Sequence, residues 1–95
     1  MSIYAVTYLY PDQADKLAEH RPAHRAFLSG LYAAKALLAS GPVSSGDVRG
    51  ALLIVQADSE QEALDLLATD PFSVNDLLAE KTVVKWDVIY GPWAE

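Results

Sequence analysis

The stretch Arg21-Pro22-Ala23-His24-Arg25 marks the start of the main helix and places two guanidinium groups beside an imidazole. Pro22 suits the first helical position, because its missing N–H would be unpaired there and its φ already matches the helix. His24 then lies on the same stripe as Phe27 and Leu28, so its ring is predicted to point inward, toward a sheet. A buried imidazole of this kind is either a hydrogen-bonded core residue or an acid/base group.

The rest of the chain alternates between strand and helix patterns. Residues 2–10 read as a strand that is apolar on both faces, which predicts cover on both sides. A short helical turn through about residue 18 precedes the main helix, residues 22–35. The other expected elements are a strand at 36–39 closed by Ser40-Gly41-Pro42, a polar loop at 43–49, a strand at 50–57, a helix at 59–69 capped by Ser59 with Glu62, a short helical turn at 73–79 and a strand at 82–90.

This order of elements predicts a ferredoxin-like α+β fold. Two βαβ units with right-handed crossovers interleave into a four-stranded antiparallel sheet with both helices on one face. Residues 1–95 then form a single domain, and the other face of the sheet stays uncovered. An uncovered apolar face on a small domain is typical of an interface, so we expect a homodimer with the two sheets packed face to face.

The composition indicates a globular protein, with 52% hydrophobic and 21% charged residues. A net charge of −6 argues against nucleic acid and against anionic membrane surfaces as partners. There is no cysteine, which excludes disulfides, thiolate zinc sites and cysteine nucleophiles. The first residues lack the pattern of a signal peptide, and no apolar run is long enough to span a membrane. A soluble, cytoplasmic protein is therefore expected.

Asp70 is the candidate partner of His24. It follows the second helix and precedes Pro71, which favours an extended conformation at position 70 and keeps it out of the helix. A carboxylate beside an imidazole fixes its tautomer and increases its basicity, which would make a general base. The alternative is that Asp70 only caps or closes a turn, as Asp-Pro often does, and that His24 is a core histidine.

Several other residues are candidates for binding a ligand. Arg21 offers paired donors to planar oxygens, and Ser40 could donate a hydrogen bond to a substrate. Ser40 is not expected to be a nucleophile, because no oxyanion hole or nucleophile turn is evident. Arg25 could likewise bind an anionic or phenolate substrate, but it points differently by one residue and is first interpreted as a solvated helix charge. The large aromatic residues could wall an apolar pocket but are first read as core or interface: Tyr4, Tyr8, Phe72, Trp86 and Trp93.

No metal or cofactor is predicted. His20 and His24 have the i, i+4 spacing of a metal-binding helix face, with Asp70 as a possible third ligand. Pro22 is expected to interrupt the helix between them, so the two imidazoles would not share a face. The chain also lacks a glycine-rich phosphate-binding loop and any sign of a haem ligand.

Three short motifs, in register over nearly the whole chain, resemble the YCII-related (YciI-like) family. They are RPAHR at 21–25, SGP at 40–42 and DPF at 70–72. The resemblance implies a ferredoxin-like protomer in a dimeric α/β barrel, with His24 and Asp70 as the catalytic pair and Arg21, Ser40 and Phe72 as substrate-binding residues. Members of the family often carry a glycine in the turn before the second strand, where this chain has Ala33-Ala34-Lys35-Ala36.

We therefore expect a small cofactor-independent enzyme that uses a His24–Asp70 dyad for general acid/base chemistry of a lyase, isomerase or hydrolase type. Its substrate would be a small cyclic or aromatic molecule that bears oxygen, because a positioned base alone contributes only about 10²–10⁴-fold and needs an activated substrate. The alternative is a non-catalytic dimeric module that binds a small molecule in the same cleft. A purely structural dimer is a third possibility.

Overall fold

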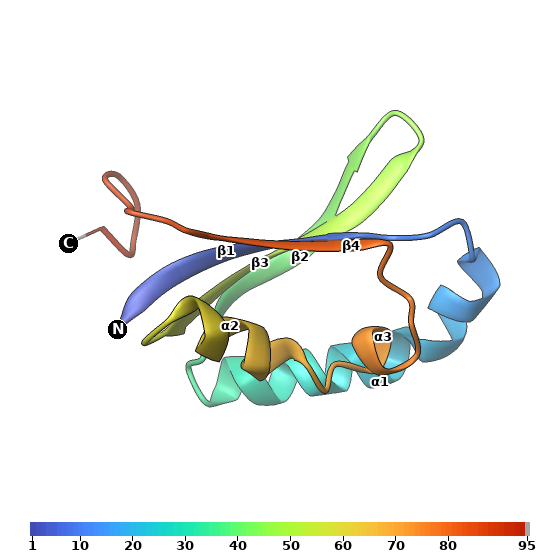
Figure 1. Ribbon diagram of the computed structural model, residues 1–95, viewed down its shortest axis with the longest axis horizontal. Helices are drawn as coiled ribbons and strands as arrows, with labels where there is room; N and C mark the ends of the chain where they lie inside the picture. The colour runs from blue at the N-terminus through green and yellow to red at the C-terminus, as the bar shows by residue number, and fades with distance from the viewer. Residues whose placement is uncertain (95) are drawn as a thin grey trace.

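The computed structural model describes residues 1–94 as one four-stranded antiparallel sheet with the helices on one of its faces (Figure 1). The strands lie in the order β2-β3-β1-β4, so β1 and β3 are central and β2 and β4 are edges. This is the predicted α+β, ferredoxin-like arrangement. The elements are β1 (Ser2–Leu9), α1 (Ala14–Ala33), β2 (Leu37–Ser45), β3 (Val48–Ala57), α2 (Glu60–Leu67), α3 (Pro71–Val74) and β4 (Glu80–Lys85).

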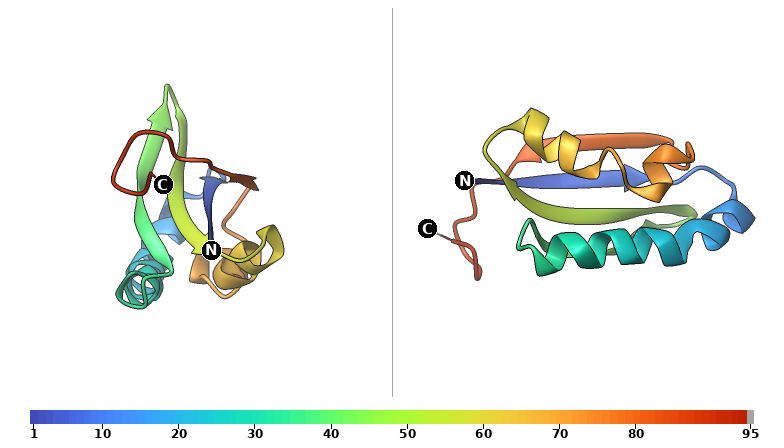
Figure 2. Two further views of the ribbon diagram at one scale, coloured as in Figure 1. Left: turned by 90° about the vertical axis from the view of Figure 1, so that its left-hand side faces the viewer. Right: turned by 90° about the horizontal axis from the view of Figure 1, so that it is seen from below.

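The core lies between the sheet and the helices. Alternate residues of β1, namely Tyr4, Val6 and Tyr8, are buried on the helix side, opposite Val55, Leu53 and Ala51 of β3. Because side chains alternate along a strand, this one face collects the large apolar groups. Figure 2, seen from below, shows α1 and the α2–α3 segment lying side by side across that face.

Helix α1 is longer than the sequence predicted, and Pro22 lies inside it rather than at its start. The expected break between a short turn and a main helix is therefore wrong. Pro22 is exposed, so its ring faces solvent, and the missing N–H removes a single helical hydrogen bond. Leu17, His24 and Leu28 are buried along one stripe, which holds the two halves of the helix on the same sheet. None of the described helices is long and apolar enough to cross a membrane.

The turn between α1 and β2 contains no glycine, and Lys35 takes the conformation that a glycine would adopt there. Lys35 adopts a left-handed conformation with φ of 65°, the region that glycine enters most easily. The Lys35 amide donates to the Tyr32 carbonyl, and the Ala36 amide donates to the Leu31 carbonyl. These two bonds form a Schellman motif, which closes the helix with lysine in the position that glycine usually takes.

The second and third strands also extend beyond their predicted ends. β2 runs through Pro42 to Ser45, and β3 begins at Val48, so the expected polar loop at 43–49 is a tight hairpin instead. Gly46, with φ of 58°, takes the positive φ that such a turn requires. Pro42 is tolerated because β2 is an edge strand, where one missing N–H breaks no ladder on the outer side.

Two elements near the C-terminus differ as well. The turn after α2 is α3, which begins directly after Asp70 with Pro71 at its first position, so the predicted start at Ser73 is wrong. Asp70 and Pro71 together give a stronger helix start than Ser73 does. β4 ends at Lys85 rather than at residue 90, although the Trp86 amide still donates to the Ile3 carbonyl.

The sheet face opposite the helices is uncovered. It carries Ile3, Thr7, Leu52, Val84 and Trp86, and the last three are 39%, 60% and 39% exposed. Figure 1 shows this face free of any helix along its whole length. The protomer therefore presents one apolar surface that its own chain does not cover.

Candidate active site

Asp70 is fixed by the local backbone before it meets any distant residue. It caps α3, with its Oδ1 accepting a hydrogen bond from the Phe72 amide at 3.0 Å, and Pro71 follows at the first helical position. The side chain is fully buried. A buried carboxylate needs polar partners to offset its lost hydration. The capping bond supplies one of them and sets the direction of the carboxylate.

His24 and Tyr8 supply the other partners. His24 Nδ1 lies 2.8 Å from Asp70 Oδ1 and 3.0 Å from Oδ2, and the Tyr8 hydroxyl donates to Oδ2 at 2.9 Å. Helix α1, strand β1 and the start of α3 thus meet at one carboxylate. Because the Tyr8 hydroxyl and the Phe72 amide both donate to Asp70, the carboxylate is arranged as an acceptor, and an ionised Asp70 takes a third hydrogen bond from His24 only when Nδ1 carries the proton.

This arrangement leaves Nε2 as the ring nitrogen of His24 that Asp70 does not contact. Nε2 makes no hydrogen bond to the described residues, yet no buried side-chain nitrogen or oxygen among them lacks a partner. Nε2 is therefore reached from outside, and His24 lines an open groove. In the neutral imidazole, this nitrogen holds the lone pair that can accept a proton.

Phe72 holds the plane of the imidazole. The two rings stack at a centroid distance of 4.0 Å with an interplanar angle of 6°, and Tyr10 meets Phe72 edge-on at 5.5 Å. Phe72 is completely buried and does not line the groove, so it lies behind His24 rather than beside a ligand. Together with the Asp70 contact, the stacking leaves the histidine ring little freedom to rotate.

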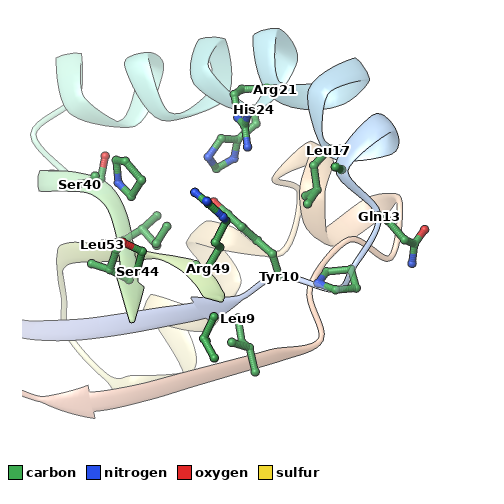
Figure 3. Close-up of a pocket in the computed structure, with 18 of the residues that line it drawn as sticks. Leu9, Tyr10, Gln13, Leu17, Arg21, His24, Ser40, Ser44, Arg49 and Leu53 are labelled. Carbon is green, nitrogen blue, oxygen red and sulfur yellow. The ribbon is translucent and has the colours of Figure 1, made fainter. Parts of the chain in front are cut away.

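The groove lies between α1 and the hairpin formed by β2 and β3. Its volume is about 1180 Å³, and it is open to solvent on one side. Figure 3 shows His24 and Arg21 entering it from α1, with Ser40, Ser44 and Arg49 on the opposite strands. The structure therefore gathers three of the predicted residues, His24, Arg21 and Ser40, around one space, with Asp70 directly behind the imidazole.

Three further residues lie at this site. Arg25 is exposed, in agreement with a solvated helix charge, and it also borders the groove. Arg49 was placed in a loop, whereas in β3 it is paired with Ser44 and shares its sheet face. Tyr8 belongs to the core, as predicted, and its additional hydrogen bond to Asp70 has no sequence signal. The Gly46-Asp47 dipeptide was the signal that could have located Arg49.

Two tyrosines near Asp70 stay protonated. Burial is the main cause that raises the pKa of Tyr8 well above its usual range, and the charge and hydrogen bond of Asp70 raise it further. Burial also raises the pKa of Tyr10, while the Arg21 guanidinium opposes that shift. Tyr8 therefore serves as a neutral donor that anchors the carboxylate.

The remaining candidates are placed elsewhere. His20 and His24 do share one continuous helix, contrary to the expected break at Pro22, but residues 1–94 contain no group of three metal-binding side chains. Trp86 and Trp93 pack edge-to-face at a centroid distance of 6.2 Å, and neither lines the groove. Tyr4 belongs to the core.

Comparison with known proteins agrees with the fold. Residues 1–87 match the YCII-related domain family, whereas no curated protein matches the chain. Among solved structures, the chain is similar to the 5-chloro-2-hydroxyhydroquinone dehydrochlorinase TftG from Burkholderia phenoliruptrix AC1100, in complex with 2,5-dihydroxybenzoquinone. The identity is 23% and the TM-score 0.78, over 98% of this chain and 99% of that chain. The predicted family resemblance and ferredoxin-like fold are confirmed.

Proposed function

The chain belongs to the YCII-related domain family, and from this premise we propose that it is a cytoplasmic, cofactor-independent enzyme with a His24–Asp70 acid/base dyad. One observation carries the proposal. A buried carboxylate holds Nδ1 of His24 at 2.8 Å, and Nε2 is left without a protein partner at the wall of an open groove. This geometry leaves the proton-accepting nitrogen open to a ligand in the groove.

In the proposed mechanism, Nε2 of His24 accepts a proton from a substrate hydroxyl or from an acidic ring carbon. Asp70 stabilises the imidazolium that forms, because its negative charge lies against Nδ1. The electron pair left on the substrate is delocalised onto oxygen, and Arg21 and Ser40 bind that oxygen. The imidazolium then returns the proton to another atom of the ring, or a leaving group departs with the electron pair.

The substrate class follows from what one base can achieve. A positioned general base contributes about 10²–10⁴-fold, which suffices only when the substrate already stabilises the developing charge. Polyhydroxylated aromatic and quinonoid rings meet that condition. The structurally similar TftG is a dehydrochlorinase of a chlorinated hydroxyhydroquinone, which supports a small oxygenated ring as the substrate class. Within this class, lyase and isomerase reactions fit the dyad best.

The proposed assembly is a homodimer that buries the uncovered sheet face. Leu52 lies near the centre of this face, on β3, and is 39% exposed. We expect the Leu52→Lys variant to become a monomer in light scattering, because a charge would be buried at the interface. Val74→Lys is the control, since Val74 is 67% exposed on α3, away from this face. A monomeric wild type would contradict the assembly.

The test of the chemistry is deuterium exchange at the ring carbons of hydroxyquinol, followed by NMR in D₂O without oxygen. Base-catalysed tautomerisation exchanges these protons, so the readout needs no knowledge of the leaving group. We expect the wild type to accelerate exchange and His24→Gln to lose about 100-fold of that acceleration. His20→Gln is the matched control, because it removes the other histidine of the same helix.

The alternative function, a non-catalytic binding module, predicts a different outcome of the same experiment. Hydroxyquinol would then stabilise the folded protein, but the wild type and His24→Gln would exchange its ring protons at the same rate. That result would replace the dyad proposal with a binding role for the groove.

A further inference from the structure

The distribution of cationic side chains is uneven. The chain contains three arginines and four lysines, and its net charge is −6. All three arginines line the groove, namely Arg21, Arg25 and Arg49, and no lysine does. In an acidic protein, this concentrates guanidinium groups, which bind planar oxyanions in pairs of hydrogen bonds, at a single place.

The arginines have no carboxylate partners. Among the described residues, no acidic oxygen lies within 4.0 Å of a guanidinium nitrogen, and the ion pair of the structure is that of His24 with Asp70. Asp12 and Asp47 also line the groove, but both are exposed and neither pairs with an arginine. The donor capacity of the three guanidinium groups is therefore available to a ligand.

The arginines approach from two sides. Arg21 and Arg25 lie on α1 on either side of His24 in sequence, one turn apart. Arg49 extends from the hairpin on the opposite wall (Figure 3). Arg49 is paired with Ser44 in the sheet, so a hydroxyl donor shares its wall. If the reacting oxygen of a ligand binds His24 and Arg21, Arg49 on the opposite wall is free to contact a second group of the same ligand.

We propose that Arg49, with Arg25, binds a carboxylate of the ligand, so that the substrate is a hydroxylated ring acid rather than a neutral phenol. This rests on the proposed function, because it takes His24 and Arg21 as the end that holds the reacting oxygen. Arg49 is then the specificity-determining residue of the groove. A carboxylate matches Arg49 for two reasons: its two oxygens lie in one plane, as the guanidinium donors do, and its negative charge is opposite to that of the arginine.

The test compares gentisate with gentisamide, which have the same dihydroxylated ring and differ in one oxygen-for-nitrogen exchange that removes the charge. Binding is measured by calorimetry, so no turnover is required. We expect the wild type to bind gentisate about tenfold more tightly than gentisamide, since a hydrogen-bonded charged group contributes roughly that factor. In Arg49→Gln this preference is lost, and in Arg49→Lys it is partly retained.

Lys16→Gln is the matched control. It removes one positive charge from the same helix as Arg25 but outside the groove, so a general electrostatic effect would lower the gentisate preference there too. A preference that survives in Lys16→Gln and disappears in Arg49→Gln supports the proposal. A preference that persists in Arg49→Gln overturns it.

The proposal and the proposed function fail in distinguishable ways. Equal affinities of the wild type for the two compounds overturn the carboxylate subsite, whereas hydroxyquinol exchange that depends on His24 leaves the enzyme proposal intact. If gentisate is preferred but exchange is independent of His24, the subsite stands and the catalytic role does not.

Discussion

The two walls of the groove are built in opposite ways. On the helix side, Asp70 accepts hydrogen bonds from His24, Tyr8 and the Phe72 amide, and it is fully buried. On the hairpin side, the side chains of Ser40, Ser44 and Arg49 are exposed and make no hydrogen bond to other described residues. The fold thus fixes the proposed proton-transfer geometry and leaves the ligand-facing hairpin free to adapt.

We therefore expect substitutions on the helix side to change the stability of the protein, and substitutions on the hairpin side to change which ligand it binds. Removing a partner on the helix side leaves other buried polar groups without hydrogen bonds, which destabilises the protein. Removing a side chain on the hairpin side leaves only solvated groups behind. Substitutions on the two walls therefore test the comparison directly.

The largest effect is expected for Asp70→Ala. This substitution removes the hydrogen-bond partner of the His24 ring, the Tyr8 hydroxyl and the Phe72 amide at once. The loss of a buried charged partner typically lowers the free energy of unfolding by about 3–5 kcal/mol. Urea denaturation measures it. Asp87→Ala is the control, because that aspartate is exposed, and a loss as small as the control's would mean that the three contacts add little.

An intermediate, pH-dependent effect is expected for Tyr8→Phe. At neutral pH the variant loses one buried hydrogen bond, about 1–2 kcal/mol. Because folding raises the pKa of Tyr8, the unfolded chain releases this proton near pH 10 and the folded protein keeps it. Wild-type stability therefore falls as pH rises above about 10, by up to roughly 1.4 kcal/mol per pH unit for this group.

The Tyr8→Phe variant lacks that contribution, so the stability gap between it and the wild type should narrow at alkaline pH. Unfolding curves from pH 8 to pH 11 measure the gap. Tyr10→Phe gives the companion series, since burial raises the pKa of Tyr10 as well. A gap for Tyr8→Phe that stays constant or widens would mean that the phenol ionises as easily in the folded protein.

The smallest effect on stability is expected for Ser44→Ala, on the hairpin wall. Ser44 is exposed and has no described side-chain partner, so the free energy of unfolding should change by less than about 0.5 kcal/mol. Thermal unfolding measures it. A loss above about 1 kcal/mol would show that the hairpin wall is as tightly built as the helix wall, and the comparison would fail.

The sequence predicted the helix wall better than the hairpin wall. His24 could be placed because its spacing to apolar helix residues survives a shift of the helix start, and Asp70 because Asp-Pro marks a defined backbone turn. Tyr8 could not, since a tyrosine within an apolar strand reads as core and its partner is 62 residues away in sequence. Such a contact depends on tertiary packing rather than on local pattern.

The predicted end of β2 and the predicted start of α1 are wrong because tertiary structure outweighs the local preference of a proline at each position. Pro42 suggested a stop, but an edge strand has a free side on which proline costs nothing. Pro22 suggested a helix start, but burial of Leu17 and Leu28 on one stripe outweighs the lost hydrogen bond. The two alternative readings of Asp70 were not exclusive either, because the cap of α3 and the partner of His24 are the same carboxylate.

Asp70 both caps α3 and contacts His24, and these two roles have different consequences for how related chains diverge. An aspartate that caps a turn is retained by selection for folding alone, even in a descendant that no longer transforms any substrate. His24 also contributes to the fold, through its hydrogen bond to Asp70 and its stacking on Phe72, but its Nε2 makes no hydrogen bond to the described residues. Among homologous chains, loss of the histidine beside a retained aspartate would mark the lineages that keep the fold without the proposed acid/base dyad.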